Sequence, residues 1–311
     1  MKETVLWLLK GSEAVTIFDK CILFIAKVVY LSLRISLRII LSKERRDRLC
    51  IKYDIDYGTI WYKCYNIFKP TSKKTFLKCK IPKYNLEFYC RNGDDFKSIT
   101  MRENDIIERF CPRPGDIVID VGAHIGKYTI IASKRIGANG KVIAIEAHPV
   151  NYEMLNRNIK LNGLTNVTTL NYAVYSKETK LKLFLPDDKL NHTIYNTLIP
   201  SRAKDEEKFI QVNANTLDNL LQKNGMPQEV NWIKIDVEGA ELEVLKGAHD
   251  IISRSNNIAV FIEVHNIGDD KNNLYRPIMD LMEKHNFTLE FENTYGSGEK
   301  HIILHKQVPI S

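Results

Sequence analysis

The stretch Ile117-Val118-Ile119-Asp120-Val121-Gly122-Ala123-His124-Ile125-Gly126 decides the fold. It begins as a short run of β-branched residues, which is typical of a strand buried on both faces of a parallel sheet. It ends in a turn with two glycines, and the run Lys127–Ile136 after it is predicted to be a helix. A strand, a glycine turn and a helix in this order predict the start of an α/β domain.

The same alternation continues along the chain. Four further apolar runs are predicted strands, at residues 141–146, 166–174, 232–237 and 258–264. A helix is predicted over Pro149–Leu161, and Asn162-Gly163 is typical of its C-terminal cap. The last two runs, 287–291 and 301–305, are joined by a short loop and must therefore pair as an antiparallel hairpin. We predict a doubly wound α/β sheet with right-handed crossovers and an antiparallel C-terminal hairpin.

A second hairpin is predicted between the third and fourth strands of this sheet. Residues 180–185 and 209–212 alternate between apolar and polar, and a helix is predicted to start near Thr216. The intervening loop, Pro186–Glu207, is expected to overhang the carboxyl ends of the strands as a lid or a substrate-contacting loop. Ligands of such sheets bind at those strand ends, so the functional residues are sought there.

The basic charge of the chain is confined to its N-terminal third. The formal net charge is +7 and the pI is near 8.9. Residues 1–113 hold 23 basic and 13 acidic residues, whereas residues 114–311 hold 22 and 25. A chain that binds a polyanion with its whole surface is therefore not indicated.

All six cysteines lie before residue 112, and none is spaced like a zinc or iron–sulfur ligand pair. They are Cys21, Cys50, Cys64, Cys79, Cys90 and Cys111. No cleavable signal peptide is recognised ahead of them. We therefore expect free thiols in a reducing cytosol.

The segment Val15–Leu41 is strongly apolar but carries basic residues on one helical face. These are Lys20, Lys27, Arg34 and Arg38, spaced 7, 7 and 4 residues apart, and the basic run Lys43–Arg48 follows. The pattern predicts an amphipathic helix that makes peripheral membrane contact through residues 15–48, at the inner face of the membrane. A helix packed on the protein or on a partner and a membrane-spanning helix remain alternatives. A charge at the bilayer centre costs about 2.5–3.5 kcal/mol, which disfavours the spanning helix.

Two acidic residues at strand ends indicate an adenosine-containing ligand. Asp120 precedes the glycine turn, whose spacing is G-x-x-x-G and not the G-x-G-x-x-G of dinucleotide-binding proteins. Nicotinamide and flavin cofactors are therefore disfavoured. Glu146 ends the second strand, where a carboxylate is placed to bind both hydroxyls of a ribose.

Together these motifs resemble the FkbM-type methyltransferases. The resemblance is carried by residues 120–126, by Glu146-Ala-His-Pro149 and by Ile235-Asp236-Val-Glu238-Gly-Ala-Glu241, and it covers roughly residues 85–306. It implies the seven-stranded methyltransferase fold, with S-adenosylmethionine as cofactor and transfer to a hydroxyl of a sugar or polyketide. His124 and Ala147 stand where the family often has asparagine and proline. The expected domains are an N-terminal appendage, residues 1–84, and a catalytic domain, residues 85–311.

The resemblance also assigns cofactor-binding residues by position. Asp120, Gly122, Ala123, His124 and Gly126 are expected around the methionine part of the cofactor. Glu146 with Ala147 is expected at the ribose, and Asn171 to Ala173 beside the adenine.

A second acidic group is expected to act on the methyl acceptor. Asp236 ends the fourth strand, and Glu238 and Glu241 are expected on one face of the helix that opens at Gly239. Glu263 and His265 alternate on the fifth strand and so point to the same side. Asp236, Glu238 and His265 are the candidate catalytic residues, with histidine suited to remove the acceptor proton. Alternatively, Asp236, Glu263 and His265 bind Mg²⁺, which would acidify the acceptor hydroxyl.

The leading functional hypothesis is a methyltransferase acting on a hydroxyl of a sugar, glycolipid or similar metabolite. A nucleic-acid methyltransferase is less favoured, because residues 1–113 contain no recognisable RNA-binding module. A non-catalytic, membrane-tethered adaptor would not need the glycine turn and Glu146. The sequence does not indicate an oligomeric state.

Overall fold

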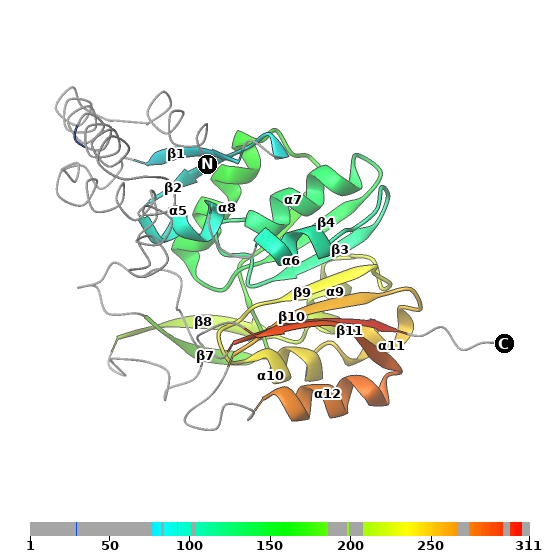
Figure 1. Ribbon diagram of the computed structural model, residues 1–311. Coiled ribbons are helices and arrows are strands. Elements are labelled where there is room, and N and C mark those ends of the chain that lie inside the picture. Colours follow the sequence, from blue (N-terminus) through cyan, green and yellow to red (C-terminus); the bar gives the residue numbers. More distant parts are fainter. Residues whose placement is uncertain are drawn as a thin grey trace, which may run out of the picture. The chain divides into compact units, whose positions relative to one another are not determined.

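The computed structural model of the protein describes residues 76–81, 84–91, 93–100, 104–185, 208–265, 274–294 and 299–306, together with Val29 and Leu198 (Figure 1). The chain divides into two compact units, Met1–Arg102 and Glu103–Ser311. The helix predicted over residues 15–41 lies outside the described residues, as does the loop 186–207 apart from Leu198. Within the described part of the chain, no helix combines the length and apolarity needed to cross a membrane.

The first unit contains a β-hairpin followed by a helix. Strands β1 (Leu77–Ile81) and β2 (Leu86–Cys90) pair antiparallel, and α5 (Gly93–Thr100) follows. The boundary predicted between residues 84 and 85 falls in the turn between these two strands, and it stays a prediction. The side chains that β2 buries alternate along it, as expected of a strand with one covered face.

The described cysteines carry free thiols, as expected. Cys79 and Cys90 lie on the two paired strands with their Sγ atoms 3.5 Å apart, and both are buried. Cys111 is exposed. Burial raises the pKa of Cys90 well above its usual value, and the hydrogen bond with Cys79 adds to the effect, so this thiol stays protonated.

The second unit is built on a seven-stranded sheet in the order β11-β12-β10-β9-β3-β4-β5. Its strands are β3 (Ile117–Val121), β4 (Lys141–Ile145), β5 (Val167–Leu170), β9 (Trp232–Ile235), β10 (Ala259–Val264), β11 (Phe287–Thr294) and β12 (Lys300–Lys306). All neighbouring pairs are parallel except those that involve β12, which runs antiparallel to β10 and to β11. The predicted doubly wound sheet with an antiparallel C-terminal hairpin is confirmed.

The predicted third strand, residues 166–174, is wrong as a single element. The structure divides it into β5 and β6 (Ala173–Val174), and β6 pairs with β8 in a separate three-stranded sheet. Between them, the Asn171 side-chain amide donates to the carbonyl oxygens of Glu146 and Ala147, at 2.7 and 3.1 Å. The strand direction changes here because Asn171 is tied to the end of β4.

The three-stranded sheet contains the predicted inserted hairpin. Strands β7 (Thr179–Phe184) and β8 (Phe209–Asn215) pair antiparallel, and helix α9 (Leu217–Lys223) follows. The Thr216 hydroxyl caps α9 by accepting from the Asn219 backbone N–H at 3.1 Å. The helix start predicted near Thr216 is therefore confirmed.

Helices cover both faces of the seven-stranded sheet. Figure 1 shows α7 (Lys127–Ile136) and α8 (Pro149–Leu161) on one side, with α10 (Glu241–Lys246) and α12 (Tyr275–Lys284) on the other. The unit also contains α6 (Asn104–Arg109) and α11 (His249–Arg254). The main hydrophobic core joins alternate residues of the sheet, such as Ile119 and Ile235, to residues of α9–α12. The residues between them along each strand point to the opposite face of the sheet, and the charged residues of the candidate site lie among these.

Candidate active site

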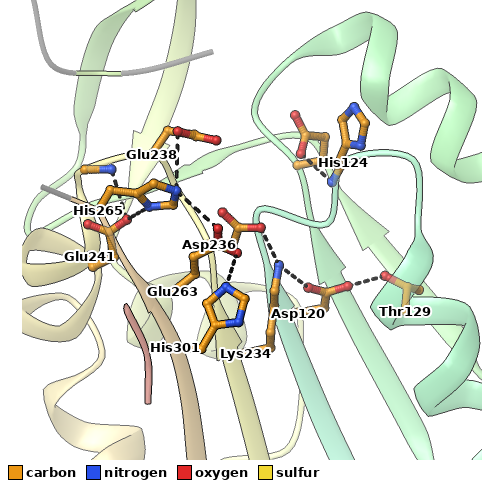
Figure 2. A network of polar contacts seen from close by, with 12 residues as sticks. Asp120, His124, Thr129, Lys234, Asp236, Glu238, Glu241, Glu263, His265 and His301 are labelled. Atoms are coloured by element: carbon orange, nitrogen blue, oxygen red, sulfur yellow. Dashed lines mark hydrogen bonds and ion pairs between the residues drawn. The ribbon is translucent and has the colours of Figure 1, made fainter. Parts of the chain in front are cut away.

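The pairing of the strands brings charged side chains together on one face of the sheet. Asp120 of β3 is the register partner of Lys234 of β9, and Glu263 of β10 is the partner of His301 of β12. Asp236 and His265 follow Lys234 and Glu263 by two residues, so they point to the same side. With Glu238 from the turn after β9 and Glu241 from the start of α10, they form what we call the strand-end network (Figure 2). Its members are Asp120, Lys234, Asp236, Glu238, Glu241, Glu263, His265 and His301.

The glycine turn after β3 lies against the backbone that follows β9. A Cβ atom at Gly122, whose φ is +80°, would lie 1.8 Å from the Asp236 carbonyl oxygen. The Asp236 backbone N–H donates to the Val121 carbonyl oxygen at 3.1 Å. Gly126 also has a left-handed φ, +98°, and a Cβ there would lie 2.8 Å from Leu155 Cδ1. Only glycine at position 122 lets the two strand ends approach this closely.

Glu146 is fixed by the turn on one side and by the start of α8 on the other. Its Oε2 accepts from the His124 backbone N–H at 2.8 Å, and its Oε1 accepts from the His148 backbone N–H at 2.9 Å. His124 has a φ of 51°, a left-handed conformation that histidine and asparagine adopt more readily than most residues. The carboxylate is therefore held in one orientation at the end of β4.

Asp120 is buried between a hydroxyl and an ammonium group. Its Oδ2 accepts from the Thr129 hydroxyl at 2.6 Å, and its Oδ1 lies 3.9 Å from Lys234 Nζ. This Oδ1 has no hydrogen-bond partner among the described residues. Burial raises the pKa of Asp120 above its usual value, although Lys234 and Thr129 oppose the rise.

Asp236 is the more exposed of the two aspartates in the network that lie near Lys234. Its side chain is 25% exposed, and its Oδ2 accepts from Lys234 Nζ at 2.9 Å. Figure 2 shows Lys234 between the two aspartates, with dashed lines to both. The lysine thus connects the cofactor side of the predicted site to the acceptor side.

His265 is surrounded by carboxylates. Its Nδ1 lies 2.8 Å from Glu241 Oε1, and its Nε2 lies 3.4 Å from Glu238 Oε2 and 3.5 Å from Glu263 Oε1. Burial alone lowers the pKa of this imidazole, but the charge of Glu238 and the hydrogen bonds to the other two carboxylates outweigh it. The pKa of His265 therefore lies well above its usual value, and the ring is an imidazolium near neutral pH.

Glu263 joins the two buried histidines of the network. Its Oε2 lies 3.2 Å from His301 Nε2, and its Oε1 faces His265. Burial raises the pKa of Glu263, but the hydrogen bonds to His265 and His301 lower it by more. The pKa of this carboxyl therefore lies well below its usual value, and the group is ionised near neutral pH. Atoms of Asp236, Glu263 and His265 that can ligate a metal lie within 4.8 Å of one another. The predicted metal triad therefore comes together.

The expectation that Glu238 and Glu241 share one face of a helix is wrong. Helix α10 begins at Glu241, and Glu238 lies in the preceding turn with a left-handed φ of 54°. Glu241 Oε1 also accepts from the Gly239 backbone N–H at 2.9 Å. Both glutamates nevertheless contact His265, Glu238 from the turn and Glu241 from the start of α10.

The other predicted cofactor-binding residues follow the ends of β3, β4 and β5 or, in the case of Ala173, begin β6. Ala123 is buried beside Leu155 of α8, while Ala147 and Ala173 belong to one small apolar cluster. Asn171 contributes its side chain to the backbone of the β4 end, as described above. Their roles toward a cofactor stay predictions.

Sequence reasoning missed three residues of this region: Thr129, Lys234 and His301. Lys234 had a visible signal, since it is the single charge in the apolar strand Trp232–Ile235. His301 could have been found only from its register with Glu263, and Thr129 only from its position on the first turn of α7 facing Asp120.

Comparison with known families identifies the domain. A family model described as "Methyltransferase FkbM domain" matches residues 120–289, which is more than half of the chain. The chain belongs to the FkbM methyltransferase family. The strand-end network lies within the matched residues except for His301. This assignment agrees with the resemblance drawn from the sequence motifs.

Curated methyltransferases align with part of this chain. Methyltransferase sdnD of Sordaria araneosa is 31% identical over 159 residues, which are 43% of this chain and 60% of that protein. Hexuronic acid methyltransferase AglP of Haloferax volcanii is 28% identical over 150 residues, which are 48% of this chain and 56% of that protein. The chain thus spans somewhat less than two thirds of the length of these relatives. A solved structure, M. jannaschii TYW2 in complex with AdoMet, is 17% identical with a TM-score of 0.42, covering 75% of this chain and 86% of that chain.

Proposed function

We propose that this FkbM-family protein transfers a methyl group from S-adenosylmethionine to a hydroxyl group of a sugar, a glycolipid or a similar metabolite. One observation carries the proposal. A turn suited to an adenosine-containing cofactor lies directly against Asp236, a partly exposed carboxylate that can act on an acceptor. The two halves of a methyl-transfer site therefore meet at the ends of β3 and β9.

The residues of the first half fit S-adenosylmethionine. Glu146 presents an oriented carboxylate of the kind that binds ribose hydroxyls. The Asp120 oxygen that has no hydrogen-bond partner among the described residues suits a ligand with cationic groups, and this cofactor carries an ammonium and a sulfonium. Gly122 and Gly126 leave two positions of the turn without a side chain, so the backbone can approach a ligand closely there. When bound, the cofactor would supply an electrophilic methyl group on its sulfonium sulfur.

The second half removes the acceptor proton. A hydroxyl oxygen becomes a better nucleophile when a nearby base takes its proton as the new bond forms. We assign this role to Asp236, since one of its oxygens is held by Lys234 and the other has no hydrogen bond to a described residue. His265 is less suited to be the base, because its imidazolium form has no lone pair to offer. Its charge instead orients Glu238 and Glu263 beside Asp236.

A divalent metal ion is the alternative means of activating the hydroxyl. Asp236, Glu263 and His265 present two carboxylates and one imidazole within reach of one ion. Mg²⁺ prefers oxygen ligands, so the imidazole makes Mn²⁺ or another transition metal the better match. Removal of metal with EDTA separates the two mechanisms. Full activity after treatment supports Asp236 as a base, and a loss that Mn²⁺ or Mg²⁺ reverses supports the metal.

The acidic character of the network disfavours a polyanionic acceptor such as a nucleic acid. Five of its eight members are carboxylates, namely Asp120, Asp236, Glu238, Glu241 and Glu263, and they would repel a phosphate backbone. Carboxylates also accept hydrogen bonds from sugar hydroxyls. The name of the Haloferax relative, a hexuronic acid methyltransferase, supports a carbohydrate acceptor.

The proposal is tested first by calorimetry with S-adenosylmethionine, and then by transfer of a labelled methyl group to neutral glycans, methyl glycosides and extracted glycolipids. Asp236→Asn should depress turnover by about 10²-fold or more while leaving cofactor affinity nearly intact. Asp280→Asn is a matched control, because this half-exposed aspartate on α12 pairs with Arg276 and is not a member of the strand-end network. Absence of cofactor binding would overturn the proposal, and near-normal turnover of Asp236→Asn would remove Asp236 from the chemistry.

A further inference from the structure

Lys234 is a buried lysine in the middle of the sheet. Its side chain is 3% exposed, and its neighbours along β9 are Ile233 and Ile235, both fully buried. An ammonium group loses most of its hydration in such a place, and it remains charged only where anionic partners replace the water. A lysine at this position is therefore held there by specific partners.

The surroundings of Lys234 fix its ammonium group at one point. Its Nζ lies 4.9 Å from the centre of the Tyr128 ring, which offers a favourable face to a cation. Tyr128 is itself packed edge-on against Phe110, with ring centres 5.3 Å apart, and lies 5.5 Å from Phe261. The Lys234 side chain thus packs against a cluster of buried aromatic rings.

Among the described residues, Asp120 and Asp236 both present a carboxylate to Lys234, but at unequal distances. Nζ donates to Asp236 Oδ2 at 2.9 Å, whereas Asp120 Oδ1 is 3.9 Å away. Asp120 is the more deeply buried of the two, with a side chain 1% exposed against 25% for Asp236. If the lysine served only to neutralise buried charge, its hydrogen bond would be expected on the carboxylate that water cannot reach. It is made instead to the carboxylate that water can reach.

We propose that Lys234 is a positioning residue that holds one oxygen of Asp236, so that the other oxygen faces the methyl acceptor. This inference rests on the proposed function, since it takes Asp236 as the group that accepts the proton. A carboxylate that rotates freely presents its lone pairs to the acceptor for only part of the time. Anchoring through a buried ammonium removes that freedom, and the backbone contact between Asp236 and Gly122 fixes the other end of the residue.

A double-mutant cycle tests this role. Lys234→Met keeps the length and apolar stem of the side chain but removes the charge. We expect Lys234→Met to lower kcat by about 10-fold or more, since a base must be held within hydrogen-bond reach of its proton. In the Asp236→Asn background the same change should have little further effect on kcat, because a positioning residue acts only through the group that it positions. Lys234→Arg should restore part of the turnover, since it keeps the charge.

The assay uses labelled S-adenosylmethionine and the neutral glycan or methyl glycoside that gives the highest turnover with the unmodified protein. Each variant is first checked for cofactor binding by calorimetry. If Lys234→Met does not fold, the cycle is run with Lys234→Arg, whose longer planar group shifts Asp236 without leaving an uncompensated charge. Losses that multiply in the double variant would overturn the proposal.

A second measurement needs no acceptor. In protein labelled with ¹⁵N-lysine, the Nζ resonance of Lys234 is assigned by its absence in Lys234→Arg. We expect this resonance to move more in Asp236→Asn than in Asp120→Asn, because the closer hydrogen bond is to Asp236. The reverse order would show that Lys234 chiefly neutralises Asp120.

The outcomes for the two proposals are distinguishable. If Asp236→Asn retains normal turnover, Lys234 has no base to position and the assignment of Asp236 fails with it. If Asp236→Asn loses turnover but the effects of the two substitutions multiply, only the role of Lys234 fails. If cofactor binding is absent in the unmodified protein, methyl transfer itself is wrong.

Discussion

The approach of two strand ends at Gly122 can be tested with one added methyl group. In Gly122→Ala the new Cβ would lie 1.8 Å from the Asp236 carbonyl oxygen and 2.8 Å from its carbonyl carbon. These atoms belong to the backbone and cannot rotate away. The alanine would also have to adopt the φ of +80° that the glycine has. The substitution therefore combines backbone strain with overpacking.

The expected loss of stability follows from these two causes. A left-handed conformation costs a residue with a side chain about 1–2 kcal/mol. Overpacking of a close contact adds about 1–3 kcal/mol. Gly122→Ala should therefore lower the free energy of unfolding by about 2–5 kcal/mol, which a domain with a typical stability of about 5–15 kcal/mol survives.

Gly115→Ala is the matched control for strain alone. Gly115 has a φ of +89°, but a Cβ atom there would meet no heavy atom within 4 Å. Its expected cost is therefore only the strain, about 1–2 kcal/mol. Urea unfolding followed by circular dichroism gives the free energy of unfolding of both variants. The difference between their losses of stability measures the steric clash between the added methyl group and the Asp236 backbone.

A functional consequence should accompany the loss of stability. The Asp236 backbone must shift to admit the methyl group, so its carboxylate shifts with it and turnover should fall in the fraction that remains folded. Gly115→Ala should keep normal turnover. Equal losses of stability in the two variants would refute the reasoning, since they would mean that the strand ends do not meet at Gly122.

Two further predictions concern glutamates outside the acceptor side. Glu146→Gln replaces one carboxylate oxygen by an amide group, which must face the backbone N–H of His124 or of His148. Loss of a hydrogen bond to a charged group costs about 1.5–3 kcal/mol. We therefore expect calorimetry to show S-adenosylmethionine binding weakened by about 10- to 100-fold. Exposed Glu153 on α8 is the control, and an unchanged affinity of Glu146→Gln would contradict the ribose assignment. Burial raises the pKa of Glu243, but hydrogen bonds from Lys246 and Ser176 lower it by more, below its usual 4.5. A group with a lowered pKa in the folded state stabilises the fold above its usual pKa, and this contribution is lost as the pH falls. The difference in free energy of unfolding between the unmodified protein and Glu243→Gln should therefore shrink when urea unfolding is moved from neutral pH to below 4.5. A constant difference would count against the ion pair.

Much of the fold could be predicted from local patterns, and the errors have identifiable causes. The bounds predicted for the helices at 127–136 and 149–161 agree with α7 and α8, since apolar periodicity and caps act within a few residues. The third strand was predicted too long because its residues favour an extended backbone throughout. Only the bond from Asn171 to the end of β4 shows where the strand breaks. Glu238 was placed on a helix because spacing alone does not reveal a left-handed turn.

The sequence by itself determined the order of the strands and helices, the glycine turn at Gly122 and the acidic residues at the strand ends. These features are local, because β-branched runs, glycines and caps act on their own neighbours. Only the tertiary structure decided which charges meet. Asp120 faces Lys234 and Glu263 faces His301 through the register of strands far apart in the chain. The charge of His265 likewise depends on burial and on three surrounding carboxylates, of which only Glu263 is close to it in the sequence.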